Sequence, residues 1–531
     1  MSLARLGLLI LMLPIAARIA PAQGAADPPS PVSVPPALVV LVTVDQFRAD
    51  YLDRFGPQLR GGLARLLRGG ASFTNAEHDH AITETAPGHA TLLSGRFPRS
   101  TGIIMNSEGV GDTSFSLLDG GIGGGASPRR FIGTTLVDWL RARDSRSRAF
   151  SVSSKDRGAI LPVGRSRAEV YWYSADGRFI TSRYYHDTLP PWVAAFNARR
   201  LPQRYAGTTW NLLLPAAAYT EPDDVPFESS DDDRVFPHRL PDDSLAAASY
   251  VRATPFVDEL TVAFALHGVR SLALGAGPQT DLLAVSLSAT DYVGHRFGPD
   301  SREIHDAVLR VDRTLGVLLD SLYRMRDSTR VVVVLTSDHG VGSIPELAAA
   351  RGVAGARRVD LAGPLLPALR NRLRLAGLDT DAVALDQQLV ITDRAALATH
   401  QRAADSVITW LAGEARTIPG VRRVDSFQSL LADTLASELA RRWSHQLPAN
   451  VPVALVVTLD SLSTWGGNIA SHGSTYEHDS HVPLIFFGAC IRPGTYPDRV
   501  RTVDIAPTLA ACTAVTPTER LDGRVLRAAL R

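Results

Sequence analysis

The stretch ALVVLVTVD, Ala37–Asp45, decides the fold class of this chain. It is a continuous run of β-branched residues and leucine, typical of a strand buried on both faces of a parallel sheet, and it ends in an aspartate. The same construction recurs at Asp281–Leu287, followed by Asp291, and at Val331–Leu335, followed by Asp338 and then His339. Three strands of one buried sheet are therefore expected to end in acidic residues.

Helical patterns separate these runs. Between Ser301 and Arg324, apolar residues recur at spacings of three and four, as on one face of a helix. Two further apolar runs, Val453–Leu459 and Val482–Phe487, are expected to add core strands near the end of the chain. Alternating strands and helices predict an α/β fold with a doubly wound, mostly parallel central sheet and helices on both faces.

Two segments depart from this alternation. Residues 166–280 are rich in aromatic side chains, and residues 355–450 are rich in Arg and Ala and predicted to be mostly helical. We interpret both as insertions that cap the sheet within a single catalytic domain, residues 37–531.

The N-terminal segment is predicted to direct export. Arg5 precedes the apolar run Leu6–Ile15, and the small residues of Ala20–Ala22 suit signal peptidase, so residues 1–22 are interpreted as a signal peptide. The run is shorter than the roughly 18 to 20 residues that span a bilayer, which argues against a stable membrane anchor. Residues 23–36 form a Pro-rich linker.

Composition excludes several classes of function. The 531 residues include 55 Lys and Arg against 54 Asp and Glu, a net charge of +1, which argues against stable binding of nucleic acid. The two cysteines, Cys490 and Cys512, cannot form a Cys-rich zinc module. In an exported chain they can form a disulfide, and two buried thiols are the alternative. Any metal must be held by His and carboxylate side chains.

In an open α/β sheet, ligands bind beyond the carboxyl ends of the strands, where Asp45, Asp291 and Asp338 would converge. Three close carboxylates repel one another unless a cation neutralises them. His295 lies four residues after Asp291, and His339 is adjacent to Asp338. Mixed Asp and His ligands favour zinc, with manganese or iron as alternatives.

A further histidine is expected from HGSTYEHDSH, which offers His472, His478 and His481. Spacing alone does not choose among them.

A hydroxyl nucleophile is predicted in TETAPGHATLLSG, residues 83–95. Thr85 precedes Pro87 and Gly88, which favour a turn before a helix, although Thr83 has the same chemistry. A threonine hydroxyl needs a base or a metal ion to become a good nucleophile.

Lys155 is the only lysine in the chain, and Arg157 follows it in SSKDRGAI. Two cations from one loop are suited to clamp a phosphoryl group. Asn106, in GIIMNSEG, is a candidate neutral donor to the same group.

Together these motifs resemble the alkaline phosphatase superfamily, which also contains the type I phosphodiesterases/nucleotide pyrophosphatases. Within it, they resemble the bacterial alkaline phosphatase branch that uses a threonine nucleophile. The resemblance extends over most of the chain after the linker. It rests on VTVDQFRADYL, TETAPGHATLLSG, SSKDRGAI, FITSRYYHDTLPPWVAAFN, SATDYVGHRFGPDS, TSDHG, HGSTYEHDSHVPLIFFG and VDIAPTLA.

The resemblance implies a zinc-dependent alkaline phosphatase with two Zn²⁺ ions per chain. The implied ligands of one zinc are Asp291, His295 and His472, and those of the other are Asp45, Asp338, His339 and the nucleophile Thr85. Asn106, Lys155 and Arg157 match residues that contact phosphoryl oxygens.

The implied reaction is hydrolysis of phosphate monoesters through a phosphothreonine intermediate, with zinc stabilising the attacking and leaving oxygens. The alternative within the superfamily is a phosphodiesterase or nucleotide pyrophosphatase, a branch that lacks the Lys and Arg. A phosphate- or zinc-binding protein without turnover would not need Thr85. The sulfatase motif is absent.

The implied partners are small phosphate esters. The implied protein is an exported, periplasmic or secreted monomer.

Overall fold

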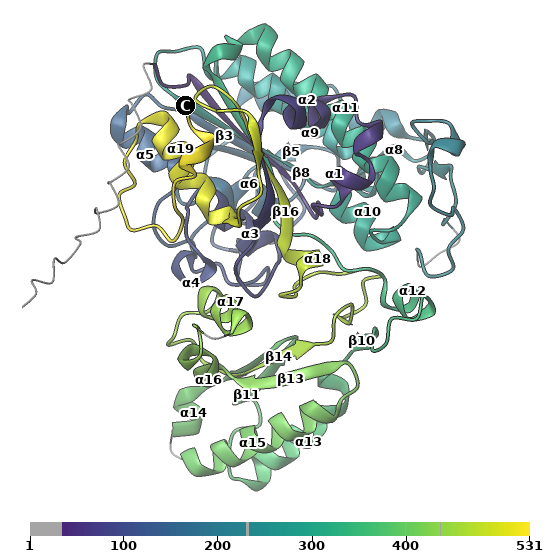
Figure 1. Ribbon diagram of the computed structural model, residues 1–531, viewed down its shortest axis with the longest axis vertical. Helices are drawn as coiled ribbons and strands as arrows, with labels where there is room; N and C mark the ends of the chain where they lie inside the picture. The colour runs from purple at the N-terminus through teal and green to yellow at the C-terminus, as the bar shows by residue number, and fades with distance from the viewer. Residues whose placement is uncertain (1–33, 230–232, 399, 436) are drawn as a thin grey trace, which may run out of the picture. The chain divides into compact units, whose positions relative to one another are not determined.

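The computed structural model describes residues 34–229, 233–398, 400–435 and 437–531. The predicted signal peptide and the linker up to residue 33 lie outside the described residues. Within these ranges, a ten-stranded, mostly parallel sheet has the order β17-β2-β16-β9-β1-β8-β3-β4-β5, with β18 paired to β2 (Figure 1). The predicted fold class is confirmed. The strands are β1 (Leu38–Val44), β2 (Ala71–Glu77), β3 (Ala149–Ser153), β4 (Glu169–Tyr173), β5 (Phe179–Ile180), β8 (Asp281–Leu287), β9 (Val331–Thr336), β16 (His481–Gly488), β17 (Gly494–Tyr496) and β18 (Val500–Arg501).

Helices cover both faces of this sheet because alternate side chains of its strands point to opposite sides. Val40 and Val42 of β1 pack into one hydrophobic cluster, whereas Val39 and Leu41 pack into another. The first cluster contains side chains of α2 (Gly62–Gly69), α9 (Phe256–Ser271), α10 (Ala289–Phe297) and α11 (Arg302–Met325). The second contains side chains of α3 (Thr85–Leu92), α5 (Leu136–Arg143), α6 (Asp156–Ile160) and α19 (Ile505–Thr513). The helix predicted between Ser301 and Arg324 is confirmed as α11, with the Ser301 hydroxyl accepting a hydrogen bond from Ile304 N.

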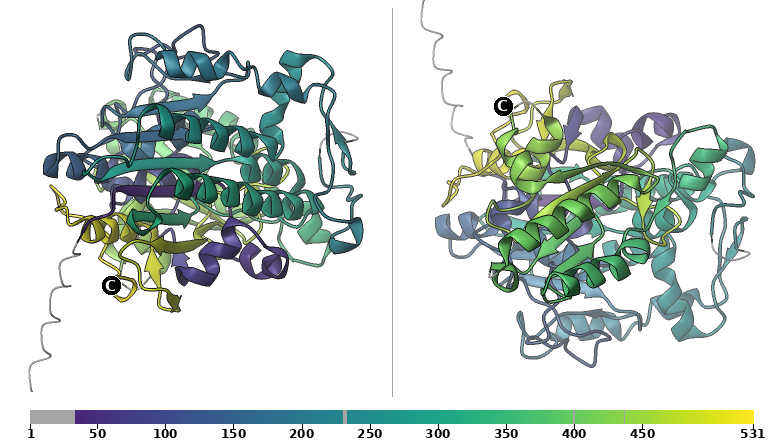
Figure 2. Two further views of the ribbon diagram at one scale, coloured as in Figure 1. Left: turned by 90° about the horizontal axis from the view of Figure 1, so that it is seen from above. Right: turned by 90° about the horizontal axis from the view of Figure 1, so that it is seen from below.

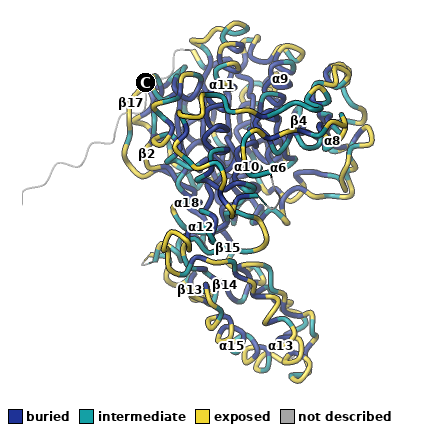
Figure 3. Tube along the Cα trace, turned by 90° about the vertical axis from the view of Figure 1, so that its right-hand side faces the viewer, coloured by how far each residue is buried: buried dark blue, intermediate teal, exposed yellow. Residues whose placement is uncertain are grey.

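A second sheet of four antiparallel strands, in the order β11-β12-β14-β13, lies in the later part of the chain. Its strands are β11 (Val383–Asp386), β12 (Leu389–Thr392), β13 (Val421–Ser426) and β14 (Val453–Leu459). The helices α13 (Ala362–Leu375) and α15 (Gln401–Thr417) pack on it, and the green part of Figure 2 (right) shows them facing the viewer. Their outer sides are exposed, whereas the central sheet is buried (Figure 3).

Two strand expectations need correction. The run Val453–Leu459 is a strand, as predicted, but its place in the central sheet is wrong because β14 pairs with β12 and β13. The run Val482–Phe487 does join the central sheet, as β16, but it is antiparallel to both neighbours. The preceding loop lies at the carboxyl edge of β9, so the chain can only enter the sheet in the reverse direction.

The two segments interpreted as insertions contain more strands than the sequence suggested. Residues 166–280 include β4 and β5 at one edge of the central sheet and also α9 on its face. Residues 355–450 include three strands of the second sheet in addition to their helices. The remaining strands form two short pairs, β6 (Thr209–Trp210) with β7 (His238–Arg239), and β10 (Arg358–Val359) with β15 (Thr464–Trp465).

The other helices are short. They are α1 (Tyr51–Arg54), α4 (Pro98–Thr101), α7 (Pro191–Asn197), α8 (Ser244–Tyr250), α12 (Pro345–Ala350), α14 (Arg394–Ala398), α16 (Phe427–Ala432), α17 (Glu438–Gln446) and α18 (Glu477–Ser480). No helix in the described ranges has the length and apolarity needed to cross a bilayer. Cys490 and Cys512, whose pairing the sequence left open, form a disulfide with their Cα atoms 5.8 Å apart.

Candidate metal centre and active site

The carboxyl ends of β8, β1 and β9 bring the three predicted aspartates to one edge of the sheet. These strands are parallel neighbours, with β1 between the other two. Asp45 directly follows β1, Asp338 lies two residues after β9, and Asp291 lies in the first turn of α10, which follows β8. All three side chains are buried.

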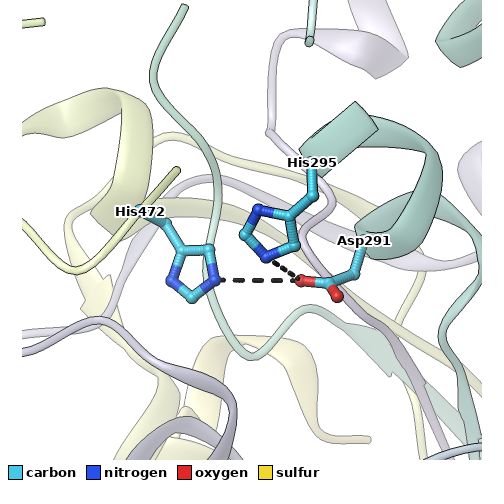
Figure 4. A group of neighbouring side chains, drawn as sticks. All are labelled: Asp291, His295 and His472. Atoms are coloured by element: carbon cyan, nitrogen blue, oxygen red, sulfur yellow. Dashed lines mark ion pairs between the residues drawn. The ribbon is translucent and has the colours of Figure 1, made fainter. Parts of the chain in front are cut away.

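Asp291, His295 and His472 form one group whose ligand atoms all lie within 4.8 Å of one another (Figure 4). His295 Nε2 is 3.3 Å from Asp291 Oδ1, and His472 Nε2 is 3.8 Å from the same oxygen. Asp291 and His295 extend from α10, whereas His472 comes from the loop before α18. Of the three histidines that the sequence offered, His472 is the one in this group.

A second group contains Asp45, Asp291 and His339, again within 4.8 Å. His339 Nε2 is 3.6 Å from Asp45 Oδ1 and 3.7 Å from Asp338 Oδ2. Asp338 Oδ2 also lies 3.1 Å from Nδ1 of His89. The predicted ligands Asp45, Asp338 and His339 thus lie close together. The group whose ligand atoms all lie within 4.8 Å of one another, however, contains Asp291 instead of Asp338.

The three histidines share one orientation. Nδ1 of His295, His339 and His472 lies 2.8 to 2.9 Å from the backbone oxygens of Ala470, Gly340 and Thr83, respectively. A carbonyl oxygen only accepts, so Nδ1 carries the proton in the neutral ring and Nε2 keeps a free lone pair. Metal-binding histidines have this arrangement, in which the outer N–H is held by a backbone carbonyl or carboxylate.

Lys155 lies between the carboxylates. Its Nζ is 2.7 Å from Asp45 Oδ2 and 2.5 Å from Asp291 Oδ2, and its side chain is 4% exposed. Burial alone would lower the pKa of Lys155, but Asp291 and Asp45 raise it above its ordinary value. The only lysine of the chain is therefore a buried cation at the centre of the acidic cluster.

The carboxylates differ in acidity although they are neighbours. Burial raises the pKa of Asp45 well above its usual range, and the negative charges of Asp291 and Asp338 add to this rise. Burial acts the same way on Asp291, but Lys155 and His295 outweigh it and hold its pKa well below the usual range. The single positive charge of Lys155 thus does not balance the negative charges of the three carboxylates, and further cations would stabilise them.

Thr85 is the first residue of α3, and its side chain lies beside His339 of the second group and beside Lys155. Its Oγ1 lies 3.4 Å from His339 Nε2 and 3.5 Å from Lys155 Nζ. Gly88 makes this placement possible, because a Cβ on residue 88 would lie 2.2 Å from the backbone oxygen of Asp338. The competing candidate Thr83 instead donates its hydroxyl to Ser474 O, at 2.8 Å.

Asn106 and Arg157, the other predicted phosphoryl contacts, flank this position. Asn106 Oδ1 accepts a hydrogen bond from Ala86 N at 2.9 Å, which leaves its amide N–H groups as donors. Burial lowers the pKa of Arg157, but its acidic neighbours, Asp156 first and then Asp45, outweigh this effect and raise it. Arg157 Nε has no hydrogen-bond partner among the described residues.

Comparisons with known proteins identify the family. The profile of type I phosphodiesterases / nucleotide pyrophosphatases matches residues 39–406. The alkaline phosphatase PafA of Elizabethkingia meningoseptica is 32% identical over 509 residues, which cover 90% of this chain and 91% of PafA. This chain belongs to the alkaline phosphatase superfamily.

Two further comparisons place it in the bacterial branch of that superfamily. The alkaline phosphatase PhoV of Synechococcus elongatus is 32% identical over 515 residues, which cover 92% of each chain. The crystal structure of wild-type PafA matches with a TM-score of 0.86 and 29% identity, and the match covers 94% of this chain and 99% of that one. The predicted family is confirmed.

Three residues that support the site of this phosphatase-family chain were not predicted. Gln46 joins two aspartates, since its backbone N–H donates to Asp338 Oδ1 (3.2 Å) and its Nε2 to Asp291 Oδ1 (3.0 Å). Nδ1 of His89 lies 2.9 Å from the backbone oxygen of Thr85. Glu84 Oε2 accepts a hydrogen bond from Asn106 N at 2.7 Å. Each is adjacent to, or one helical turn from, a predicted residue, which is the only signal that the sequence offers.

Proposed function

We propose that the protein is a metal-dependent alkaline phosphatase that hydrolyses phosphate monoesters, with Thr85 as the nucleophile. The observation that carries this proposal is the position of Thr85 Oγ1 within 3.5 Å of both His339 and Lys155, at the edge of a cluster of three buried aspartates. The family relationship supports the same activity, because PafA and PhoV, which both match nearly the whole chain, are alkaline phosphatases.

The residues at the sheet edge fit two divalent cations. Asp45 Oδ1 has no hydrogen-bond partner among the described residues, whereas Asp45 Oδ2 lies 2.7 Å from Lys155 Nζ and Asp338 Oδ2 lies 3.1 Å from His89 Nδ1. The histidines present unprotonated Nε2 atoms, and oxygen with nitrogen donors favours zinc. The ligands would be Asp291, His295 and His472 for one ion and Asp45, Asp338 and His339, with Thr85, for the other. Bound there, the ions would neutralise the carboxylates and act as Lewis acids toward the ester oxygens.

Thr85 would accept the phosphoryl group. Its Oγ1 loses its proton to solvent and forms a bond to phosphorus while the bond from phosphorus to the alcohol oxygen breaks. That oxygen leaves with the electron pair and takes a proton from solvent, so the alcohol is released with no net change in protons. Water then attacks the phosphothreonine, releasing phosphate and restoring the hydroxyl. His89 lies against Thr85 O, and Glu84 and Asn106 fix the backbone on either side, so the nucleophile is held in place.

Lys155 and Arg157 support a preference for monoesters. A monoester dianion has one more charged oxygen than a diester, and two cations beside Thr85 stabilise that charge. Lys155 Nζ, 3.5 Å from Thr85 Oγ1, is within reach of a group bound to that oxygen. The Asn106 amide would add a neutral donor.

Diester hydrolysis is the second candidate because the matching family profile is that of phosphodiesterases and nucleotide pyrophosphatases. The decisive experiment compares kcat/KM for an aryl phosphate monoester and its methyl diester, using the zinc-loaded protein at alkaline pH. We expect a ratio well above one. A ratio well below one would make the protein a diesterase and remove the proposed role of both cations.

We also infer that the protein is exported, to the periplasm or outside the cell. The disulfide between Cys490 and Cys512 supports this, since disulfides persist in oxidising compartments. The predicted signal peptide points the same way. Cell fractionation tests the inference, and a cytoplasmic mature protein would contradict it.

A further inference from the structure

The tip of the β11–β12 hairpin lies beside the proposed phosphoryl site. Asp386 pairs with Leu389, so the two residues between them, Gln387 and Gln388, form the turn. This turn belongs to the second sheet and contributes no proposed metal ligand. It closes a cavity of about 250 Å³ that we call the acidic pocket, lined by Glu84, Met105, Asn106, Ser107 and the segment 386–388.

The acidic pocket adjoins the reacting groups. Asn106, a proposed phosphoryl contact, is part of its wall, and Glu84 precedes the nucleophile Thr85 in the chain. On the other side of Glu84 is the loop that holds His472, because a Cβ on Gly473 would lie 4.0 Å from Glu84 Cγ. The pocket thus lies where the alcohol part of a bound ester can extend from the phosphoryl group.

The charge of this wall has one sign. It contains two carboxylates, Glu84 and Asp386, and no basic side chain. An ammonium group complements such a wall, whereas a carboxylate or second phosphate would be repelled.

Gln388 points to a polar ligand independently of these charges. The residue is 7% exposed and lines the pocket, and no hydrogen bond of its side chain occurs within the part of the chain that the structure describes. Its backbone oxygen accepts a hydrogen bond from Val457 N at 2.8 Å, which anchors the turn to β14. Its amide oxygen is therefore not used by the chain itself and can accept a hydrogen bond from an ammonium N–H.

We propose that the acidic pocket binds the alcohol part of the substrate and selects phosphate monoesters whose alcohol carries an ammonium group. The phosphoryl group would lie against Asn106, and the ammonium group would lie between Asp386, Glu84 and the amide oxygen of Gln388. This selectivity rests on the proposed phosphatase activity.

The first test compares kcat/KM for O-phosphoethanolamine and for n-propyl phosphate, which has a methyl group in place of the ammonium. We expect a ratio of about 10 for the wild-type protein, and a fall of about 3- to 10-fold in Asp386→Asn, which keeps the shape and removes one charge. Asp381→Asn is the matched control, because Asp381 is an exposed aspartate just before the same strand. Glu84→Gln is less specific, since Glu84 also holds Asn106.

The second test needs neither turnover nor a variant. Calorimetry measures the binding of 3-aminopropylphosphonate and of n-butylphosphonate, which cannot be hydrolysed, to the zinc-loaded wild-type protein. We expect the ammonium compound to bind about 3- to 10-fold more tightly. Equal binding of the two phosphonates, or a kinetic ratio that Asp386→Asn leaves unchanged, would overturn the pocket assignment.

The two proposals fail in different ways. A protein that hydrolyses p-nitrophenyl phosphate but shows no preference between the alkyl esters is a phosphatase without the acidic pocket. A protein that hydrolyses none of the three esters is not the proposed phosphatase, and the phosphonate comparison alone then decides whether the pocket binds ammonium groups.

Discussion

The carboxyl edge of the central sheet and the tip of the β11–β12 hairpin both border the proposed substrate site, but their side chains are held very differently. At the sheet edge, Asp291 contacts Lys155, Gln46 and His295, and it is buried. At the hairpin tip, no side-chain hydrogen bond of Gln388 occurs among the described residues. The reacting groups thus lie on elements whose positions the fold determines, whereas the pocket wall that meets the alcohol part lies on a turn that is easily varied.

The largest effect is expected from replacing the proposed nucleophile at the sheet edge. We expect Thr85→Ala to lower kcat/KM for aryl phosphate by about 10⁴-fold or more, because no other hydroxyl takes its place. Zinc content, measured by mass spectrometry of the metals, should remain that of the wild type. Thr83→Ala is the matched control. Equal losses of kcat/KM in the two variants would show that the loss in Thr85→Ala comes from a disturbed structure and not from a missing nucleophile.

Lys155→Met should produce the next largest effect. Removing the cation beside Thr85 should lower kcat/KM for monoesters by about 10²-fold and leave diesters within a few-fold of wild type, because the diester has less charge to stabilise. Steady-state kinetics on the matched aryl pair measures both losses. Equal losses would mean that Lys155 only supports the carboxylates Asp45 and Asp291, which it contacts in this structure.

The disulfide should affect the stability of the central sheet and not its selectivity. Cys490 and Cys512 are 22 residues apart, and loop-entropy models assign about 3 kcal/mol to closing a loop of this length. We therefore expect Cys490→Ser with Cys512→Ser to lower the thermal midpoint by a few degrees. The phosphoethanolamine to propyl phosphate ratio should not change, and a changed ratio would show that the two regions are coupled.

A smaller stability effect is expected at Glu228, far along the chain from the hairpin. Its side chain is buried, and burial, with Glu303 and Asp300 nearby, raises its pKa to about 9. The folded state therefore holds a proton that the unfolded state loses near pH 4.5, so this group costs stability increasingly as pH rises from about 4.5 to about 9.

Glu228→Gln removes this cost. The thermal midpoint of the variant should equal that of the wild type near pH 4.5 and exceed it by a margin that grows with pH to at least about 1 to 2 °C at pH 9. Thermal unfolding across this pH range measures the difference. The exposed change Glu108→Gln is the control, and a difference that shrinks with rising pH would contradict the assignment.

The strands of the central sheet could be predicted because they are long, apolar and followed by acidic residues. The run at Ala37–Asp45 is buried throughout, and β8 and β9 repeat its pattern. The second sheet was missed because β11 and β12 are only four residues long and are joined by Gln387 and Gln388, which are not typical turn residues. The run Val453–Leu459 has the composition of a core strand, and only its pairing partners reveal which sheet it joins.

The proposed ligands and nucleophile could be predicted because their chemistry is unusual in such positions, as with Asp291 and His295. Gln46, His89 and Glu84 could not, because an amide, a histidine or a carboxylate near a motif has many roles. Their contacts depend on side-chain directions that arise only when separate strands and helices meet. The position of Lys155 between two aspartates has the same origin, since β3 and β8 must first lie side by side.

The most direct test of the central claim is to trap the phosphorylated protein. Zinc-loaded protein would be mixed with aryl phosphate, quenched in acid within one turnover, digested and analysed by mass spectrometry. We expect one added phosphoryl group on the peptide that contains Thr85, and none in Thr85→Ala. A protein that turned over substrate before the quench but has no phosphorylated peptide would contradict the assignment of Thr85 as the nucleophile. A phosphoryl group on a peptide without Thr85 would contradict it as well.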